Sequence, residues 1–236
     1  MFVHYIDKKL TIMVSGIKFN MCKDLYIKDP QDTDLGKKIL KNSILLIDEI
    51  GFESFTFKKL ANRISSAEKS IYRYFLNKHH LLLFLTSWYW EWVYYLINVN
   101  LRNIEDPTKR LNIAIEKIVH ATSENFHTEY INENILHKVV INEGAKSYHT
   151  FEVDNENKAG LFQSYKKLTK TLVDIILEIQ TDFPYSKSLA SSLFEMSNNQ
   201  IYFAEHLPKL TSLQSDPIDD NELIEMLQFF AKKLLS

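Results

Sequence analysis

Apolar residues recur at intervals of three and four along most of the chain, which is the period of an amphipathic α-helix. Capping residues and breakers separate these runs: Asp106 precedes an N1 proline, and Gly51 follows an apolar run. The pattern predicts an all-α protein of nine helices, three short ones in front and six behind. The expected ranges are about 34–50, 57–64, 66–75, 78–100, 107–124, 130–142, 155–181, 186–206 and 219–235, with a polar loop at 144–154.

The second and third predicted helices carry the most specific pattern. Thr56 is the expected N-cap of the second helix, and Ser65 with Glu68 matches the S-x-x-E capping box of the third. Two short helices joined by a tight turn are typical of a helix-turn-helix. The expected inward residues are Leu60, Ala61, Ile64, Ala67, Ile71 and Phe75. The outward residues of the third helix are polar and rich in donors, which suits the major groove of DNA: Glu68, Lys69, Ser70, Tyr72 and Arg73.

Composition removes several classes of protein. Hydrophobic residues make up 45% of the 236 positions and charged residues 25%, which excludes a wholly disordered chain. Only 5 glycines are present, and no glycine-rich phosphate loop is found. Cys22 is the single cysteine, so no intramolecular disulfide and no cysteine-built zinc site are expected, and a cytoplasmic location is favoured. No window is apolar enough to predict a membrane span.

Charge is divided unevenly along the chain. Residues 32–80 contain 9 basic and 6 acidic side chains, a net charge of +3, whereas residues 81–236 contain 14 and 21, a net charge of −7. Residues 1–31 carry +2. A basic front and an acidic back are expected of a protein whose front meets a polyanion.

One combination of residues points to a known family. Gly51-Phe52 is followed by Thr56, then by Leu60-Ala61, then by the run Ile71 to Phe75, and finally by Asn77-Lys78 and Leu81-Leu82. The stretch from Leu35 to Leu82, about a fifth of the chain, resembles the TetR/AcrR family of bacterial transcriptional regulators. The turn departs from the family pattern, because Ser65 and Ser66 stand where Gly and Val are usual. A turn without glycine must avoid left-handed geometry or strain it.

The resemblance implies an N-terminal extension (1–31), a helix-turn-helix DNA-binding domain (32–80) and a six-helix ligand-binding and dimerisation domain (81–236). It implies a homodimer that binds a pseudopalindromic operator and releases it when a small molecule binds, with repression as the usual outcome. The candidate DNA contacts are Thr56, Lys69, Ser70, Tyr72, Arg73, Tyr74 and Lys78. Local roles remain open for them: Thr56 could serve only as a cap, and either tyrosine ring could be packed.

Aromatic residues crowd the back of the chain, and some of them could line a small-molecule pocket. The alternative is that each ring is ordinary core. The pocket candidates are Trp88, Trp92, Tyr95, His120, His127, Phe162 and Gln163. An apolar effector is expected. Apolar stripes on the last helix (Leu223, Met226, Leu227 and Phe230, with Ile224, Ala231 and Leu235) predict dimerisation through the last two helices.

Other functions have weaker support. A single E-x-x-H at Glu124–His127 lacks the second motif that a di-iron site needs, so no metal or cofactor is expected. No catalytic motif appears, and the protein is not expected to be an enzyme. The competing function is a ligand- or lipid-binding protein that has lost DNA binding, with a helical enzyme third. Met21 could be the true start, which would make residues 1–20 a flexible or artefactual extension; a signal peptide is a poorer alternative, and whether residues 1–20 are translated or ordered stays open.

Overall fold

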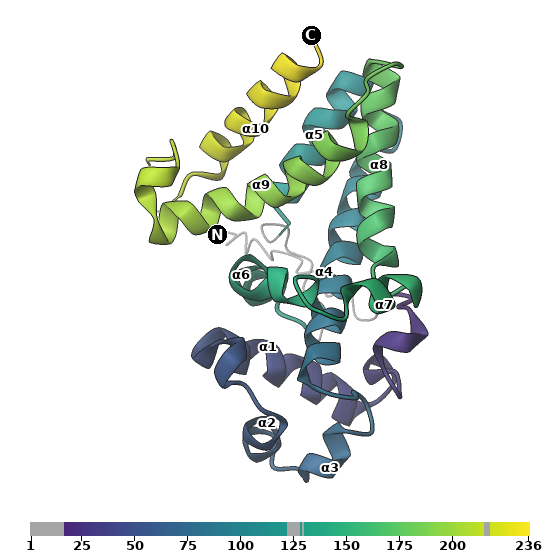
Figure 1. The fold of residues 1–236 in the computed structure, drawn as a ribbon, viewed down its shortest axis with the longest axis vertical. Helices are drawn as coiled ribbons and strands as arrows, with labels where there is room; N and C mark the ends of the chain where they lie inside the picture. Colours follow the sequence, from purple (N-terminus) through teal and green to yellow (C-terminus); the bar gives the residue numbers. More distant parts are fainter. Residues whose placement is uncertain (1–16, 122–127, 129, 215–217) are drawn as a thin grey trace, which may run out of the picture.

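The computed structural model describes residues 17–121, 128, 130–214 and 218–236. Within these residues all regular structure is helical, which confirms the all-α class. Three helices form the front of the molecule, at the bottom of Figure 1: α1 (Asp34–Ser54), α2 (Phe57–Arg63) and α3 (Glu68–Ile71). From there α4 (Lys78–Asn100) leads into the rest of the chain. The remaining α-helices are α5 (Pro107–Val119), α6 (Glu133–Glu143), α7 (Val153–Lys158), α8 (Gln163–Ile179), α9 (Ser186–His206) and α10 (Asp220–Leu234).

The described part of the back therefore holds seven α-helices, one more than expected. The predicted helix 155–181 is interrupted at Gly160, whose φ of +86° lies in the left-handed region that glycine adopts freely. The chain turns there, and Leu161 and Phe162 become buried before α8 begins. Part of the predicted loop 144–154 is also ordered as a 3₁₀ helix, η3 (Gly144–Ser147).

Local capping explains where several helices begin. The side chain of Thr56 accepts a hydrogen bond from Lys59 N at 3.2 Å, and Asn77 accepts one from His80 N at 2.9 Å. Asp106 accepts from two backbone N–H groups of α5, directly before Pro107. Each bond satisfies a donor that the first turn of a helix leaves free. At the other end of α1, Gly51 leaves helical geometry with a φ of +74°, at the predicted position.

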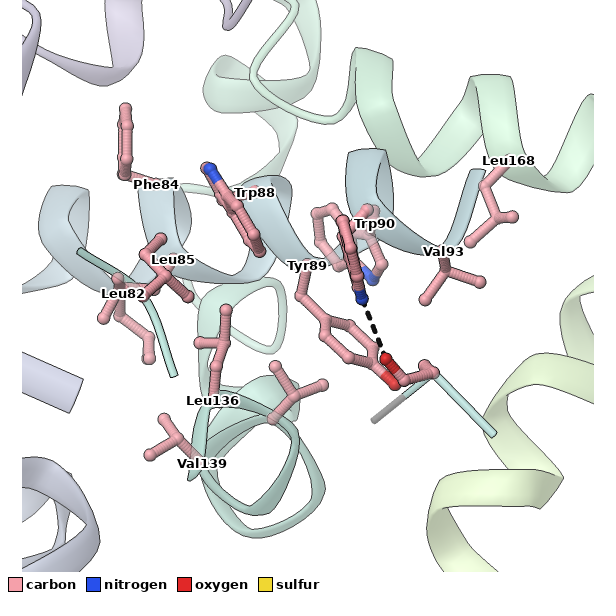
Figure 2. Close-up of a cluster of buried hydrophobic side chains, with 14 of the residues drawn as sticks. Leu82, Phe84, Leu85, Trp88, Tyr89, Trp90, Val93, Leu136, Val139 and Leu168 are labelled. Atoms are coloured by element: carbon pink, nitrogen blue, oxygen red, sulfur yellow. Dashed lines mark hydrogen bonds between the residues drawn. The ribbon is translucent and has the colours of Figure 1, made fainter. Parts of the chain in front are cut away.

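The core is centred on α4. Trp88, Tyr89, Trp90 and Trp92 are all 2% exposed or less, and Figure 2 shows Trp88, Tyr89 and Trp90 in a buried cluster that also includes Leu136 and Val139 of α6. Contacts with α5, α6 and α8 cover α4 on most sides. A helix that is apolar around its whole circumference is expected to be buried in this way.

The segment before α1 is packed against the body of the protein. Phe19 meets the ring of Trp88 at 5.2 Å, and its backbone is held by the side chain of buried Gln31 through two hydrogen bonds of 3.2 and 3.0 Å. The hydroxyl of Tyr130 donates to Ile17 O at 3.1 Å. The alternative of a flexible extension is therefore wrong for residues 17–20; residues 1–16 lie outside the described part of the chain.

The last helix buries members of both predicted apolar stripes inside its own chain. Leu223, Leu227 and Ala231 are 2% exposed or less, since α10 packs on α5 and α9. Because these residues are already buried within one chain, the prediction that they form the dimer interface is wrong. Phe229, Phe230 and Leu234 are the large apolar side chains that α10 leaves exposed.

Candidate nucleic-acid interface

The helix-turn-helix is built on an apolar inner face. The inward residues predicted from the sequence are buried, namely Leu60, Ala61, Ile64, Ile71 and Phe75, with one exception. Ala67 is exposed and forms the N-cap of α3. The buried set holds α2 and α3 in a fixed relation, so the outer side of α3 is presented by a rigid support.

The turn between the two helices is a Schellman motif closed by a serine. Ser66 N donates to Ala61 O at 2.9 Å, and Ser65 N donates to Asn62 O at 3.2 Å. Ser65 occupies the left-handed position with a φ of +53°. Of the two alternatives for a turn without glycine, the chain adopts left-handed geometry and accepts the strain.

The predicted capping box is wrong. Ser65 belongs to the C-terminal end of α2, and no side chain caps α3, which begins at Glu68 and has four residues. A serine cannot close one helix in left-handed geometry and also serve as the N-cap of the next, because an N-cap has extended backbone angles.

Replacing Ser65 by glycine is expected to stabilise the protein by about 1 kcal/mol, because glycine takes the left-handed conformation without the clash of a Cβ atom. Urea denaturation of Ser65→Gly against the wild type measures the gain. Ser65→Ala is the matched control, since it removes the hydroxyl and keeps the Cβ. An equal gain in both variants would contradict the assignment of strain to the backbone.

Lys69 and Arg73 are the two cations best placed for DNA. Both are exposed, and neither makes a hydrogen bond or ion pair with any residue that the structure describes. Ser70 lies between them and is half-buried. Thr56 is exposed at the start of α2, where its capping bond leaves its hydroxyl able to donate to a phosphate.

The two tyrosines differ in burial. Tyr72 is 47% exposed, with its ring edge against Phe57 at 5.0 Å. Tyr74 is 4% exposed, and its hydroxyl is 2.7 Å from Thr33 Oγ1, the N-cap of α1. Tyr72 is therefore available to contact DNA. Tyr74 instead packs inside the front domain, so its prediction as a DNA contact is wrong.

Lys78 also has a structural role. Its Nζ donates to Phe52 O and Glu53 O at 3.0 and 3.1 Å, and it lies 4.7 Å from the centre of the Phe52 ring. The ammonium thus satisfies carbonyls at the end of α1. Lys78 therefore has a structural role at the end of α1, while its contact with a phosphate stays a prediction.

One exposed cation was missed in the sequence. Lys58, in the first turn of α2, has no partner among the described residues. Its place directly after the N-cap Thr56 is the signal that could have identified it, since the N-terminus of a helix attracts phosphate. Arg63, by contrast, is held by both oxygens of Glu49 at 2.5 and 2.8 Å, and this guanidinium lowers the pKa of that carboxyl.

The pocket candidates are placed mostly as core. Trp88 and Trp92 stack with their centres 5.9 Å apart, and Tyr95 continues the stack at 5.8 Å while remaining 38% exposed. Trp92 Nε1 donates to Ala121 O at 2.8 Å. Phe162 is buried, Gln163 is exposed, and His120 lies 4.0 Å from Asp220. His127 lies outside the described residues.

A polar group that sequence reasoning did not select lies deeper in the helical domain. His137 of α6 is buried and stacks on Tyr89 at 5.2 Å, and its burial lowers its pKa to about 4. Nearby on α8 and α9, the hydroxyl of Tyr165 donates to Glu195 at 2.5 Å, and burial raises the pKa of Tyr165. Glu195 also borders a small hollow of about 30 Å³, the size of a single water molecule.

The described residues contain no group of three or more histidine, cysteine or acidic side chains arranged to hold a metal ion. Their helices include none that is long and apolar enough to cross a membrane.

Two short helices joined by a supported turn, with unpaired donors on one outer surface, have the geometry of a helix-turn-helix. Residues 39–84 match the family model described as bacterial regulatory proteins, tetR family. The chain accordingly has the fold of a TetR-family transcriptional regulator, with the DNA-binding domain of that family at its front.

Solved structures agree with this fold over most of the chain. A putative TetR-family transcriptional regulator from Syntrophomonas wolfei str. Goettingen matches with a TM-score of 0.62 and 18% identity, covering 84% of this chain and 93% of its own. AibR in complex with isovaleryl coenzyme A and operator DNA matches with a TM-score of 0.56 and 15% identity, covering 82% of this chain and 97% of its own. The fatty acid degradation regulator FadR from Bacillus halodurans matches with a TM-score of 0.57 and 15% identity, covering 82% of this chain and 92% of its own. No curated protein sequence matches the chain.

Proposed function

We propose that the protein is a homodimeric repressor that binds a pseudopalindromic operator in the cytoplasm and leaves it when a small molecule occupies the helical domain. The observation that carries the proposal is the pair of exposed, unpaired cations, Lys69 and Arg73, on a rigid helix-turn-helix. AibR, which shares the fold, has been crystallised with operator DNA and isovaleryl coenzyme A together. TetR-family regulators are generally non-enzymatic, and the proposal includes no reaction.

Lys69 and Arg73 are expected to matter for DNA binding and not for folding, because both are exposed and neither makes a hydrogen bond or ion pair with a described residue. Arg73→Ala should cost about 1–3 kcal/mol of binding to the operator and relax specificity, if its guanidinium reads a base. Lys69→Ala should weaken binding to all sequences and reduce the slope of log K against log salt by about 1. Fluorescence anisotropy with labelled genomic fragments at several salt concentrations measures both effects.

Lys170→Ala is the matched control for these variants. Lys170 is an exposed lysine of α8 paired with Asp174 at 2.7 Å, far along the chain from the helix-turn-helix. Wild-type DNA affinity in Lys69→Ala and Arg73→Ala would mean that the protein presents another surface to DNA.

The proposed effector is mostly apolar, with an aromatic or acyl portion. Support comes from the exposed ring of Tyr95 at the end of the Trp88–Trp92 stack and from the absence of Lys and Arg among the buried described residues of the helical domain. A thermal-shift screen that compares apolar compounds with small hydrophilic anions should find stabilisation by members of the apolar set. To raise the population of the DNA-free conformation from 1% to 99%, an effector must bind that conformation about 5.5 kcal/mol more tightly than the DNA-bound one. Stabilisation by the anions alone would contradict an apolar effector.

The competing function is a ligand-binding protein on this fold that no longer binds DNA. The strained Ser65 and the four-residue α3 are the observations that favour it. Ligand binding together with absent DNA binding at low salt would select this alternative.

A further inference from the structure

A hollow lies at the junction of the DNA-binding domain and the helical domain. Its volume is about 380 Å³, within the range of small-molecule pockets. One wall comes from α1, and the other walls come from α6, η3 and the end of α9. Figure 1 shows α6 lying between α1 and α9, and α6 makes contacts with both of them. We refer to this space, lined by Asp48, Glu143, Lys146, Tyr202 and His206 among others, as the junction hollow.

At the junction hollow, polar side chains connect the DNA-binding domain to the helical domain. Glu143 Oε1 of α6 accepts a hydrogen bond from Phe52 N of α1 at 2.9 Å, next to the non-helical Gly51. Its other oxygen lies 2.6 Å from Lys146 Nζ, and Lys146 also reaches Glu53 of α1 at 3.2 Å. These contacts pair the charge of Glu143 with that of Lys146. The pKa of Lys146 is raised by Glu143 and Glu53, so its charge is committed to them.

Asp48 is the charged group that these contacts leave free. It borders the hollow from α1, and it makes no hydrogen bond or ion pair with any described residue. On the side of α9, the rings of Tyr202 and His206 lie 4.6 Å apart and form an aromatic wall. Ile47 and Val139 also border the hollow, but they are only 1% and 2% exposed, so the aromatic wall supplies most of its apolar surface. A free carboxylate opposite an aromatic wall favours a cation, through ion pairing and through attraction to the ring face.

We propose that the junction hollow binds a small organic cation, an amine or guanidinium with a compact apolar or aromatic body. The charged head pairs with Asp48, and the body lies against the aromatic wall of Tyr202 and His206. This site is separate from the stacked rings of α4, because none of the pocket candidates Trp88, Trp92 or Phe162 borders it. A cation bound here touches α1 and α6 at once, so it favours the relation between the two domains that this structure has.

Binding is tested with three probes that share a phenyl group and differ in charge: 2-phenylethylamine, 2-phenylethanol and phenylacetate. Isothermal titration calorimetry with the full chain should show binding of the amine and at least tenfold weaker binding of the alcohol and the acid. Asp48→Asn should reduce the affinity for the amine about tenfold, because the neutral amide keeps the shape and loses the charge-assisted bond. Equal binding of all three probes, or no heat with the amine at millimolar concentration, would overturn the proposal.

Two further variants separate the site from general effects of charge and folding. Asp154→Asn removes an exposed carboxylate of α7 that has no partner among the described residues, and it should leave the affinity for the amine unchanged. Asn142→Trp fills the hollow from α6 without changing charge, and it should abolish binding while the circular dichroism spectrum stays that of the wild type. A loss of affinity in Asp154→Asn equal to that in Asp48→Asn would overturn the role of Asp48. Retained binding in a folded Asn142→Trp would overturn the location.

The consequence for DNA rests on the proposed function and has its own readout. Saturating amine should change the affinity of the wild type for DNA, and it should leave the DNA affinity of Asp48→Asn unaltered. Reciprocally, DNA should change the affinity for the amine by the same factor. Amine binding without any DNA binding would refute the proposed function and leave the site intact, whereas DNA binding without amine binding would do the reverse.

Discussion

Acidification from about pH 7.5 to pH 4 is expected to cost the protein about 3 kcal/mol of folding stability through His137 alone. His137 is 6% exposed and stacked on Tyr89, and burial lowers its pKa to about 4 in spite of an opposing hydrogen bond with Asn198. In the unfolded chain its pKa returns to about 6.5. As the pH falls below that value, His137 becomes protonated in the unfolded chain, whereas in the folded protein it stays neutral until about pH 4. The contribution of His137 to the free energy of unfolding is therefore fully present above pH 6.5 and is lost as the pH falls from 6.5 to 4.

Urea denaturation at fixed protein concentration, at a series of pH values, measures this loss. His137→Gln removes the titrating group while retaining a polar side chain, so the fall of stability between pH 6.5 and 4 should be smaller by most of that 3 kcal/mol. His149→Gln is the matched control, because His149 is exposed and should leave the pH dependence as it is in the wild type. An unchanged pH dependence in His137→Gln would mean that this imidazole is not held neutral in the folded protein.

Charged substitutions on the exposed stripe of α10 are expected to make the protein monomeric and to weaken operator binding by about 10²-fold or more. Phe229 and Phe230 are 57% and 39% exposed in the single chain, with Leu234 at 55% on the following turn. Because these side chains are exposed, Phe229→Glu combined with Phe230→Glu should leave the fold of the protomer intact. A dimer holds two recognition helices on one operator, so each monomer loses the gain that comes from binding both half-sites together.

Light scattering at micromolar concentration measures the mass of the wild type and of the double variant, and anisotropy measures their DNA affinity. Phe151→Glu is the control, because Phe151 is 99% exposed in the turn before α7 and belongs to no stripe of α10. A monomeric wild type, or a double variant that remains dimeric with full DNA affinity, would contradict the proposed interface.

Features set by neighbouring residues were predictable from the sequence. Thr56 and Asp106 cap the helices that they were expected to cap, because a cap bonds to donors two or three residues away. Gly51 marks the break at the end of the apolar run of α1 for the same local reason. The family pattern from Leu35 to Leu82 also depended on such short-range features.

Features set by distant residues were not predictable. The alternation that makes Tyr72 exposed and Tyr74 buried depends on Thr33, 41 positions earlier than Tyr74 in the chain. Lys78 is occupied by carbonyls of α1, and a single sequence gives no indication of that contact. Residues 17–20 looked unstructured because their partners, Trp88 and Tyr130, lie far along the chain. Ser65 was mistaken for a cap because its residue type suits a cap, whereas the backbone requirement of the preceding helix decided its role.

The most direct test of the central claim is DNase footprinting of genomic fragments by the purified protein, at low and at physiological salt, for the wild type and for Arg73→Ala. The account predicts protection of an inverted pair of half-sites whose centres are separated by about 34–36 Å or a multiple of it, with affinity that falls linearly in log K against log salt. Arg73→Ala should lose that protection at concentrations where the wild type retains it. No protection at low salt, or protection without preference for any sequence, would contradict the assignment of this protein as an operator-binding regulator.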